Sequence, residues 1–236
     1  ELHPEATWHE SLDTLPADGP YLIVANEFFD ALPIEQHVKT AAGWRRHMVG
    51  RDRNKFMAVP DDAPDPSGII LKTNIFPDGT ILETSPASTD ILSGLADRLA
   101  KHGGVLLIID YGYNQPGTGS TLQAIKGHLP VSPFDSPGTS DLTAHVNFLD
   151  LANVARSHML SIHGPTEQGQ WLKAIGIDHR ATVLAAAAPK KAESIRSAHD
   201  RLTHVDEMGR LFRAMAAVSM DWPNPEGFVY QDKETD

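Results

Sequence analysis

Two carboxylates stand beside two aromatic rings in residues 26–33, where the sequence reads Asn-Glu-Phe-Phe-Asp-Ala-Leu-Pro. The carboxylates belong to Glu27 and Asp30, and Pro33 restricts the backbone where the segment ends. Carboxylates next to aromatic faces are suited to holding a cation, because charge pairing and the negative face of the ring act on the same group. A guanidinium substrate and a sulfonium cofactor both fit this description.

Two short apolar runs end in polar residues that could lie at the same edge of a sheet. Residues 21–25 precede Asn26, and residues 105–109 precede Asp110 and Tyr111. Such runs are typical of strands that are buried on both faces. Ligands bind outside the carboxyl ends of the strands in an open parallel α/β sheet, so these polar residues are natural ligand contacts. The alternative is that Asn26 and Asp110 only cap the turns that follow.

The elements around these strands predict an α/β fold with a parallel sheet. Residues 88–102 carry apolar side chains at helical spacing, and Gly103-Gly104 ends this helix just before the second strand. A helix directly followed by a buried strand is the pattern of a parallel sheet. Residues 211–218 and 227–230 are expected to pair as a closing hairpin. Further helices are expected over residues 147–155, 166–175, 178–188 and 189–205.

Two stretches are expected to be insertions in this fold. Residues 35–85 contain short β-like pieces between turns, which indicates an antiparallel meander with further strands at 69–71 and 80–83. Residues 113–146 are rich in Gly, Pro, Ser and Thr, and a structureless loop of this length is usually a lid or a binding insertion. We expect this second insertion to face the substrate.

The composition excludes several classes of protein. At 236 residues, with 41% hydrophobic and 22% charged, the chain is typical of one globular domain. It has no cysteine, which excludes disulfides, thiolate metal ligands and a cysteine nucleophile. Its net charge of -11 disfavours nucleic acid and anionic membranes, and no apolar run approaches the roughly 20 residues that span a bilayer. Its 12 histidines form no zinc-binding pattern, so we predict no metal site.

A series of unusual motifs runs in order along nearly the whole chain. They are residues 26–34 with Gln36, Gly43-Trp44, residues 109–112, residues 141–146 with Phe148, Gln168-Gly169, Leu172 with Gly176-Ile177 and Arg180, and Met208-Gly209 with Leu211-Phe212. Together they resemble the MidA family. The resemblance implies a class I, Rossmann-like methyltransferase fold whose parallel sheet has an antiparallel hairpin end and β-rich or loop insertions. It also implies S-adenosyl-L-methionine as the cofactor and methylation of an arginine on a respiratory complex I (NADH dehydrogenase) subunit, in support of complex assembly.

The resemblance also indicates which part of the fold is present. The family's glycine-rich loop after its first strand, and its ribose-binding acidic residue after the second, have no counterpart in residues 1–236. We therefore expect these residues to be the C-terminal two-thirds of a single methyltransferase domain, with the N-terminal part of the sheet missing. Independent catalysis by these residues alone is not expected.

Residue by residue, the resemblance implies roles at the end of the first strand. Asn26, Glu27 and Phe28 match positions that border the cofactor. The candidate catalytic residues are Glu27, Asp30 and His145. Glu27 is expected to orient and pair with the guanidinium while its nitrogen attacks the methyl carbon, so that proximity and electrostatics supply most of the rate.

Other matched positions are expected to line the substrate side. Asp110, Tyr111 and Asp141 are the candidates for substrate binding. For His145 two readings stay open: it accepts a proton from the substrate, or it is a helix-entry histidine bonded to Asp141.

A different class of function also stays open, namely a non-catalytic assembly or binding module that keeps the fold. A nicotinamide-dependent oxidoreductase is disfavoured because its glycine fingerprint is missing. The expected partner is a protein substrate, without nucleic acid or membrane insertion, and a homodimer is an open possibility. The expected location is the cytoplasm for a bacterial protein and the mitochondrial matrix for a eukaryotic one.

Overall fold

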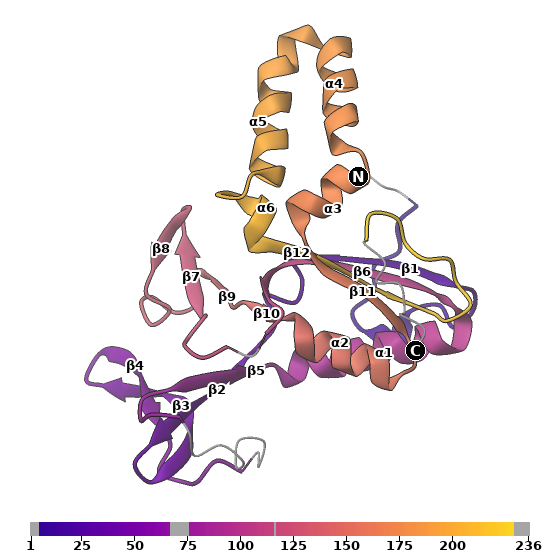
Figure 1. The fold of residues 1–236 in the computed structure, drawn as a ribbon. Coiled ribbons are helices and arrows are strands. Elements are labelled where there is room, and N and C mark those ends of the chain that lie inside the picture. Colours follow the sequence, from indigo (N-terminus) through magenta and orange to yellow (C-terminus); the bar gives the residue numbers. More distant parts are fainter. Residues whose placement is uncertain (1–4, 67–75, 116, 229–236) are drawn as a thin grey trace. The chain divides into compact units, whose positions relative to one another are not determined.

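The chain forms two compact units that alternate along the sequence, and the computed structural model describes residues 5–66, 76–115 and 117–228. Unit 1 takes in the described residues of 1–25, 89–109 and 150–236. Unit 2 takes in those of 26–88 and 110–149. Figure 1 labels the helices and strands of both units.

Unit 1 is built on a sheet with the strand order β1-β6-β12-β11. The strands are β1 (Tyr21–Asn26), β6 (Gly104–Tyr113), β11 (Ser161–Glu167) and β12 (Phe212–Val218). The two apolar runs of the sequence thus form strands of one sheet, as expected, and they are neighbours in it. The predicted pairing of 211–218 with 227–230 is wrong, because β12 pairs with β11 on one side and lies beside β6 on the other. Residues 229–230 lie outside the described residues.

The sheet in Figure 1 has α1 (Pro86–His102) and α2 (Phe148–Ser157) on one side. The short η1 (Leu12–Thr14) precedes the sheet in sequence. Leu92, Leu95 and Leu99 lie on the buried side of α1, which confirms the predicted helix. The helix ends at Gly103, whose φ of 81° favours glycine, and a Cβ there would lie 2.6 Å from the indole nitrogen of Trp222.

The C-terminal part of unit 1 is mainly helical. It contains α3 (Gln168–Ala174), α4 (Ile177–Ala187), η2 (Pro189–Lys191), α5 (Ala192–Thr203) and α6 (Met208–Leu211). Contacts between α4 and α5 make them a helical hairpin (Figure 1). These helices confirm the three predicted between 166 and 205. No helix in the described residues is long and apolar enough to cross a membrane.

A hydrophobic cluster in unit 1 joins the sheet to α3. Trp171 of α3 packs with Phe228 and with the buried side chains of Ala214, Ala216 and Val218 on β12. Alternate residues of β6, at positions 105, 107 and 109, pack against the same cluster. The remaining apolar positions of β6 are also buried, so this strand is covered on both faces, as its continuous apolar run predicts.

Unit 2 contains an antiparallel sheet with the order β4-β3-β2-β5. Its strands are β2 (Glu35–Thr40), β3 (Gly43–Asp52), β4 (Lys55–Pro60) and β5 (Ile81–Thr84). This confirms the predicted meander and the strand predicted over 80–83. The strand predicted at 69–71 lies outside the described residues.

A smaller sheet in unit 2 has the order β8-β7-β9. It consists of β7 (Gln123–Lys126), β8 (Leu129–Val131) and β9 (Asp141–Thr143), and β10 (Val146–Asn147) then pairs in parallel with the end of β6. The prediction of a structureless loop over 113–146 is therefore wrong. The strands are too short for a period-2 pattern to show, and one of them, β8, contains Pro130, a residue that is rare in strands.

Candidate functional site

The backbone after β1 is held in place by one buried carboxylate. The N–H groups of Phe28, Phe29 and Asp30 donate to Oδ2 of Asp110, at 3.2, 3.1 and 3.3 Å. Oδ1 of Asp110 accepts the N–H of Tyr111 at 2.9 Å. These residues all belong to unit 2, and Asp110 brings the ends of two apolar runs together at one point.

Asp110 has no exposed surface, and both of its oxygens accept backbone N–H groups. Burial, followed by the nearby charge of Asp30, raises the pKa of Asp110 to about 7, while its backbone hydrogen bonds act in the opposite direction. The sequence suggested that Asp110 binds substrate. That contact stays a prediction, while the hydrogen bonds of Asp110 give it a positioning role, because they fix the turn that carries the exposed residues.

Asp30 is the second buried carboxylate of the site, with 5% of its surface exposed. Its Oδ2 accepts the hydroxyl of Tyr111 at 2.6 Å, and its carbonyl accepts the N–H of Ala144 at 3.0 Å. Its Oδ1 is buried and has no hydrogen-bond partner in the described part of the chain. A buried carboxylate oxygen without a donor is costly, so this atom is suited to receive an N–H from a ligand.

Tyr111 bridges Asp30 and His145. Burial, and then its hydrogen bond to Asp30, raise the pKa of the Tyr111 hydroxyl well above its ordinary value. The hydroxyl therefore stays protonated and acts as a donor. The rings of Tyr111 and His145 meet edge to face, with centroids 5.5 Å apart.

Asn26, Glu27 and Phe28 are exposed beside this buried pair of carboxylates. Glu27 has a φ of 46°, a left-handed backbone conformation that is rare outside glycine. Phe28 is 43% exposed and contacts the buried Phe29 edge to face at 5.3 Å. An exposed carboxylate thus stands next to an exposed aromatic side chain, the combination from which the sequence predicts a cation site.

His145 is held by Thr121 and lies beside Gln123 of β7. Its backbone N–H donates to Oγ1 of Thr121 at 3.0 Å, and its Nε2 lies 3.1 Å from Nε2 of Gln123. Burial lowers the pKa of His145, and the charge of Glu83 partly opposes this. The ring is therefore neutral at neutral pH.

Asp141 does not join His145 in the way that one reading of the sequence expected. Asp141 is exposed on β9, opposite Ile125 of β7. The hydrogen bonds of the described residues do not link it to His145, whose ring neighbours are Gln123 and Tyr111. A contact of Asp141 with substrate stays a prediction.

Glu83 on β5 is a residue that the sequence did not single out. Its Oε1 accepts the side-chain amide of Gln36 at 2.7 Å and the N–H of Thr121 at 2.9 Å. Its Oε2 accepts the hydroxyl of Thr121 at 2.5 Å, and that hydroxyl oxygen in turn accepts the N–H of His145. Glu83 therefore ties β5 to the segment that carries His145. No local pattern marks Glu83, because its partners are distant in sequence.

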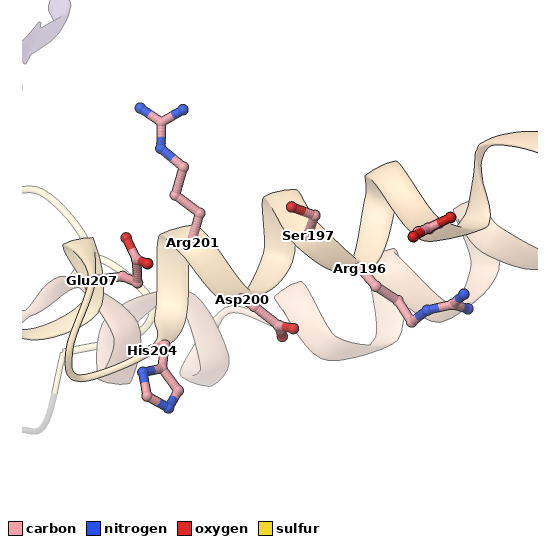
Figure 2. Close-up of a pocket in the computed structure, with 7 residues that line it drawn as sticks. Arg196, Ser197, Asp200, Arg201, His204 and Glu207 are labelled. Carbon is pink, nitrogen blue, oxygen red and sulfur yellow. The ribbon is translucent and has the colours of Figure 1, made fainter. Parts of the chain in front are cut away.

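Two other kinds of functional site, a metal centre and a pocket on α5, find no support in the described residues. No group of three or more His, Cys, Asp or Glu side chains there could hold a metal ion. Figure 2 shows a hollow on α5 lined by charged, exposed side chains, where Arg201 and His204 point away from each other. Its lining has no buried polar group, so nothing in it is preorganised for chemistry.

Comparison with known proteins gives a family match over most of the chain. Residues 2–166 match a family model described as "Putative S-adenosyl-L-methionine-dependent methyltransferase". The mouse protein named "Protein arginine methyltransferase NDUFAF7, mitochondrial" is 34% identical over 219 residues, which are 90% of this chain and 49% of the mouse protein. Its Caenorhabditis elegans homologue is 32% identical over 243 residues, 97% of this chain and 56% of that protein. The chain thus spans about half the length of these relatives.

Two crystal structures of Burkholderia thailandensis proteins share the fold. One, of an uncharacterised protein, has a TM-score of 0.76 at 26% identity and covers 87% of this chain and 57% of that one. The other protein is bound to S-adenosyl-homocysteine and gives a TM-score of 0.74 at 24% identity over 87% of this chain and 55% of that one. These structures confirm the α/β fold class expected from the sequence.

Proposed function

The chain belongs to this family of S-adenosyl-L-methionine-dependent methyltransferases, and from that premise we propose that it is part of a protein arginine methyltransferase. The single observation that carries the proposal is the turn held by Asp110, which presents the exposed Glu27 and Phe28 beside the buried Asp30. The names of the mouse and worm relatives support arginine as the methylated residue.

We propose further that these residues are the C-terminal two-thirds of one methyltransferase domain. The relatives are about twice as long as the matched region, and residues 1–236 contain no glycine-rich loop of the expected kind. Among the described strands, β1 lies at one edge of its sheet, and its Leu22 and Val24 are 76% and 68% exposed. An edge strand can pair with a further strand, and its exposed apolar face can be covered by a further element of the N-terminal part.

The residues after β1 fit a sulfonium cofactor. S-adenosyl-L-methionine, when bound, supplies a methyl group carried on a positively charged sulfur. Glu27 and Phe28 offer that cation an exposed carboxylate and an aromatic face, and the side chain of Asn26 offers polar contacts beside them. The glycine-rich loop that would complete the cofactor site is proposed to lie in the N-terminal part.

The buried groups of the site fit an arginine side chain. The five N–H donors of a guanidinium can pair with Glu27 and with the unpartnered Oδ1 of Asp30. Tyr111 holds the other oxygen of Asp30, which keeps that carboxylate in one orientation. His145, neutral because burial lowers its pKa, accepts the proton that the nitrogen loses on methylation. Asp141 contacts the substrate from β9.

Methyl transfer by the full-length protein that contains this chain tests the proposal. Glu27→Gln keeps the shape of the side chain and removes its charge, so we expect kcat/KM to fall by roughly a hundredfold. Glu10→Gln, an exposed change of the same kind, is the matched control. Unimpaired transfer by Glu27→Gln would refute the assigned role.

Calorimetry with S-adenosyl-L-methionine separates the enzyme from a non-catalytic module of the same fold. We expect the full-length protein to bind the cofactor and residues 1–236 alone not to bind it. Absence of binding by both chains would refute the enzyme and favour the module.

Glu83→Gln tests how His145 is positioned. The change removes the charge that raises the pKa of His145, so this pKa should fall further. It also weakens the hold on Thr121, and we expect kcat to fall by about tenfold with little change in KM. The acidic limb of the pH–rate profile should shift to lower pH. A profile identical to that of the wild type would contradict this role.

The identity of the substrate protein and the cellular location are also proposals. We propose that the substrate is a subunit of respiratory complex I and that its methylation supports assembly of the complex. The protein would act in the mitochondrial matrix in a eukaryote, as the names of the mitochondrial relatives suggest, and in the cytoplasm in a bacterium. Mass spectrometry of complex I from cells with and without the intact gene would identify the arginine, or refute the assignment if no methylation differs.

A further inference from the structure

The hairpin formed by β3 and β4 is basic in an otherwise acidic chain. Residues 43–60 hold five of the chain's 20 Lys and Arg residues and one of its 31 acidic residues, a net charge of +4 against -15 for all the others. Of these five cations, only Arg46 has an ion-pair partner in the described residues, at 3.3 Å from Glu35. The other four leave a positive field that attracts anionic groups.

Apolar side chains of the same hairpin are exposed on both of its faces. The strand register pairs Arg51 with Phe56, so Val49 and Phe56 share one face with Arg51, and Met48 and Met57 share the other. The exposed fractions are 67% for Val49, 41% for Phe56, 46% for Met48 and 45% for Met57. Exposed apolar groups among unpaired charges are typical of a surface that binds a partner.

A hollow lies beside the turn of the hairpin, within unit 2. Its lining comes from Asn54 of the turn, from residues 55–56 at the start of β4 and from residues 132 and 134–137, including Phe134. Phe56 and Phe134 supply apolar surface to this lining, which also includes Lys55 and Asp135. The hollow could therefore receive an apolar side chain that has a carboxylate as its neighbour.

We propose that the β3–β4 hairpin is the docking surface for an acidic, amphipathic segment of the protein substrate. Only the identification of this partner as the substrate rests on the proposed function. Carboxylates of the segment pair with Arg51, which shares a face with Val49 and Phe56, and with Arg53 and Lys55 at the end of the hairpin. The apolar side chains of the segment pack on Val49 and Phe56. The net charge of -15 elsewhere repels the same segment, which confines the contact to the hairpin.

A protein segment suits the hairpin better than a bilayer or a nucleic acid does. Arg53 lies in the turn, and Arg51 and Lys55 lie at the adjoining strand ends, so a bilayer approached by this end of the hairpin would meet cations before apolar side chains. A bilayer or a nucleic acid extends beyond the hairpin, so its phosphates also meet the repulsive negative charge of the remaining residues, whereas a short acidic segment contacts the hairpin alone. Phe56 is the only exposed aromatic side chain among the described residues of the hairpin, too little for stacking on successive bases.

Binding of a labelled probe peptide to the full-length protein tests the docking surface. The probe is a fluorescein-labelled peptide of alternating glutamate and leucine residues, followed by fluorescence anisotropy. Arg53→Glu with Lys55→Glu, and separately Val49→Ser with Phe56→Ser, should each raise its Kd by about tenfold or more. Lys190→Glu with Lys191→Glu makes the same change of charge at exposed positions on η2 and should leave the Kd unchanged.

Several results would overturn the proposal. These are an unchanged Kd in both hairpin variants, an equal loss in the η2 control, or tighter binding of the hairpin to phosphatidylserine vesicles or to a single-stranded oligonucleotide than to the probe. Wild-type self-association that the hairpin variants abolish, seen by sedimentation, would identify a second copy of the chain as the partner instead.

Methylation kinetics separate failure of docking from failure of the proposed function. For the hairpin variants, KM should rise about tenfold with the intact complex I subunit and stay unchanged with a short peptide that holds only its target arginine. An equal rise in KM with both substrates would contradict docking of the substrate on the hairpin. If the wild type methylates neither substrate, the proposed function fails, while the anisotropy experiment still decides whether the hairpin binds an acidic segment.

Discussion

Replacing Asp110 with Asn should remove a pH dependence of stability that this single carboxyl contributes. The folded state raises the pKa of Asp110 from 3.8 to about 7, so the folded protein retains a proton between these pH values that the unfolded chain has lost. The contribution of Asp110 to the free energy of unfolding is therefore fully present below pH 3.8 and is lost as the pH rises through about 7.

The size of this effect follows from the two pKa values. Their difference corresponds to roughly 4 kcal/mol at most, since each tenfold change in proton affinity is worth about 1.4 kcal/mol. Asparagine cannot titrate, so the difference in unfolding free energy between wild type and Asp110→Asn should shrink by up to that amount between pH 4 and pH 8. Asp62→Asn, which removes an exposed carboxylate, is the matched control.

Urea unfolding followed by tryptophan fluorescence at several pH values measures this difference, because the chain has four tryptophans. A difference between wild type and Asp110→Asn that stays constant across the range would refute the argument. If the variant fails to fold, a carbon NMR titration of the Asp110 carboxyl in the wild type decides directly, and an ordinary pKa would refute it.

Three further substitutions test the neighbouring groups. Tyr111→Phe removes the donor to Asp30 Oδ2 and should lower the free energy of unfolding by roughly 1–3 kcal/mol, measured in urea. Gly112→Ala places a Cβ 2.0 Å from the carbonyl oxygen of Val146, so we expect loss of the β6–β10 pairing, measured by amide hydrogen exchange. Glu27→Gly relieves a left-handed backbone and should stabilise the fold by up to about 1 kcal/mol in urea while methyl transfer is lost.

Each of these outcomes can be contradicted. An unchanged unfolding midpoint in Tyr111→Phe would show that Asp30 gains nothing from the hydroxyl. Normal protection of the amides on β10 in Gly112→Ala would show that the strands can separate slightly without cost. Full methyl transfer by Glu27→Gly would show that the side chain of Glu27 takes no part in the mechanism.

The sequence predicted the ends of β1 and β6 because both strands are continuous apolar runs that stop at a polar residue. It did not predict what Asp110 does there. The hydrogen bond from Phe28 to Asp110 joins residues 82 apart, and neither composition nor spacing carries that information. Full burial of Asp110 beneath the turn is likewise a property of the tertiary structure, and the substrate contact expected of it stays a prediction.

β11 and Glu83 were missed for two different physical reasons. Gly164-Pro165 interrupts β11, and the pairing with β12 shifts register between His163 and Thr166, so the segment reads as a turn. Glu83 lies in a strand that was predicted, but its importance depends on Thr121, which reaches it from the second insertion. A role set by one such distant contact has no local signature.

Glu27 and Asp110 act together, because Asp110 holds the turn in which the backbone of Glu27 is strained. A glutamate in the left-handed region costs roughly 1 kcal/mol relative to glycine, and it persists only where the surrounding structure determines it. The residues immediately after Glu27 fix its backbone conformation, because their three consecutive N–H groups donate to one buried oxygen of Asp110. Nothing in the packing requires an exposed carboxylate at this position, where glycine would be less strained. A requirement for the side chain of Glu27 in binding or chemistry would explain both the strained backbone at Glu27 and the three hydrogen bonds to Asp110 that hold the turn after it.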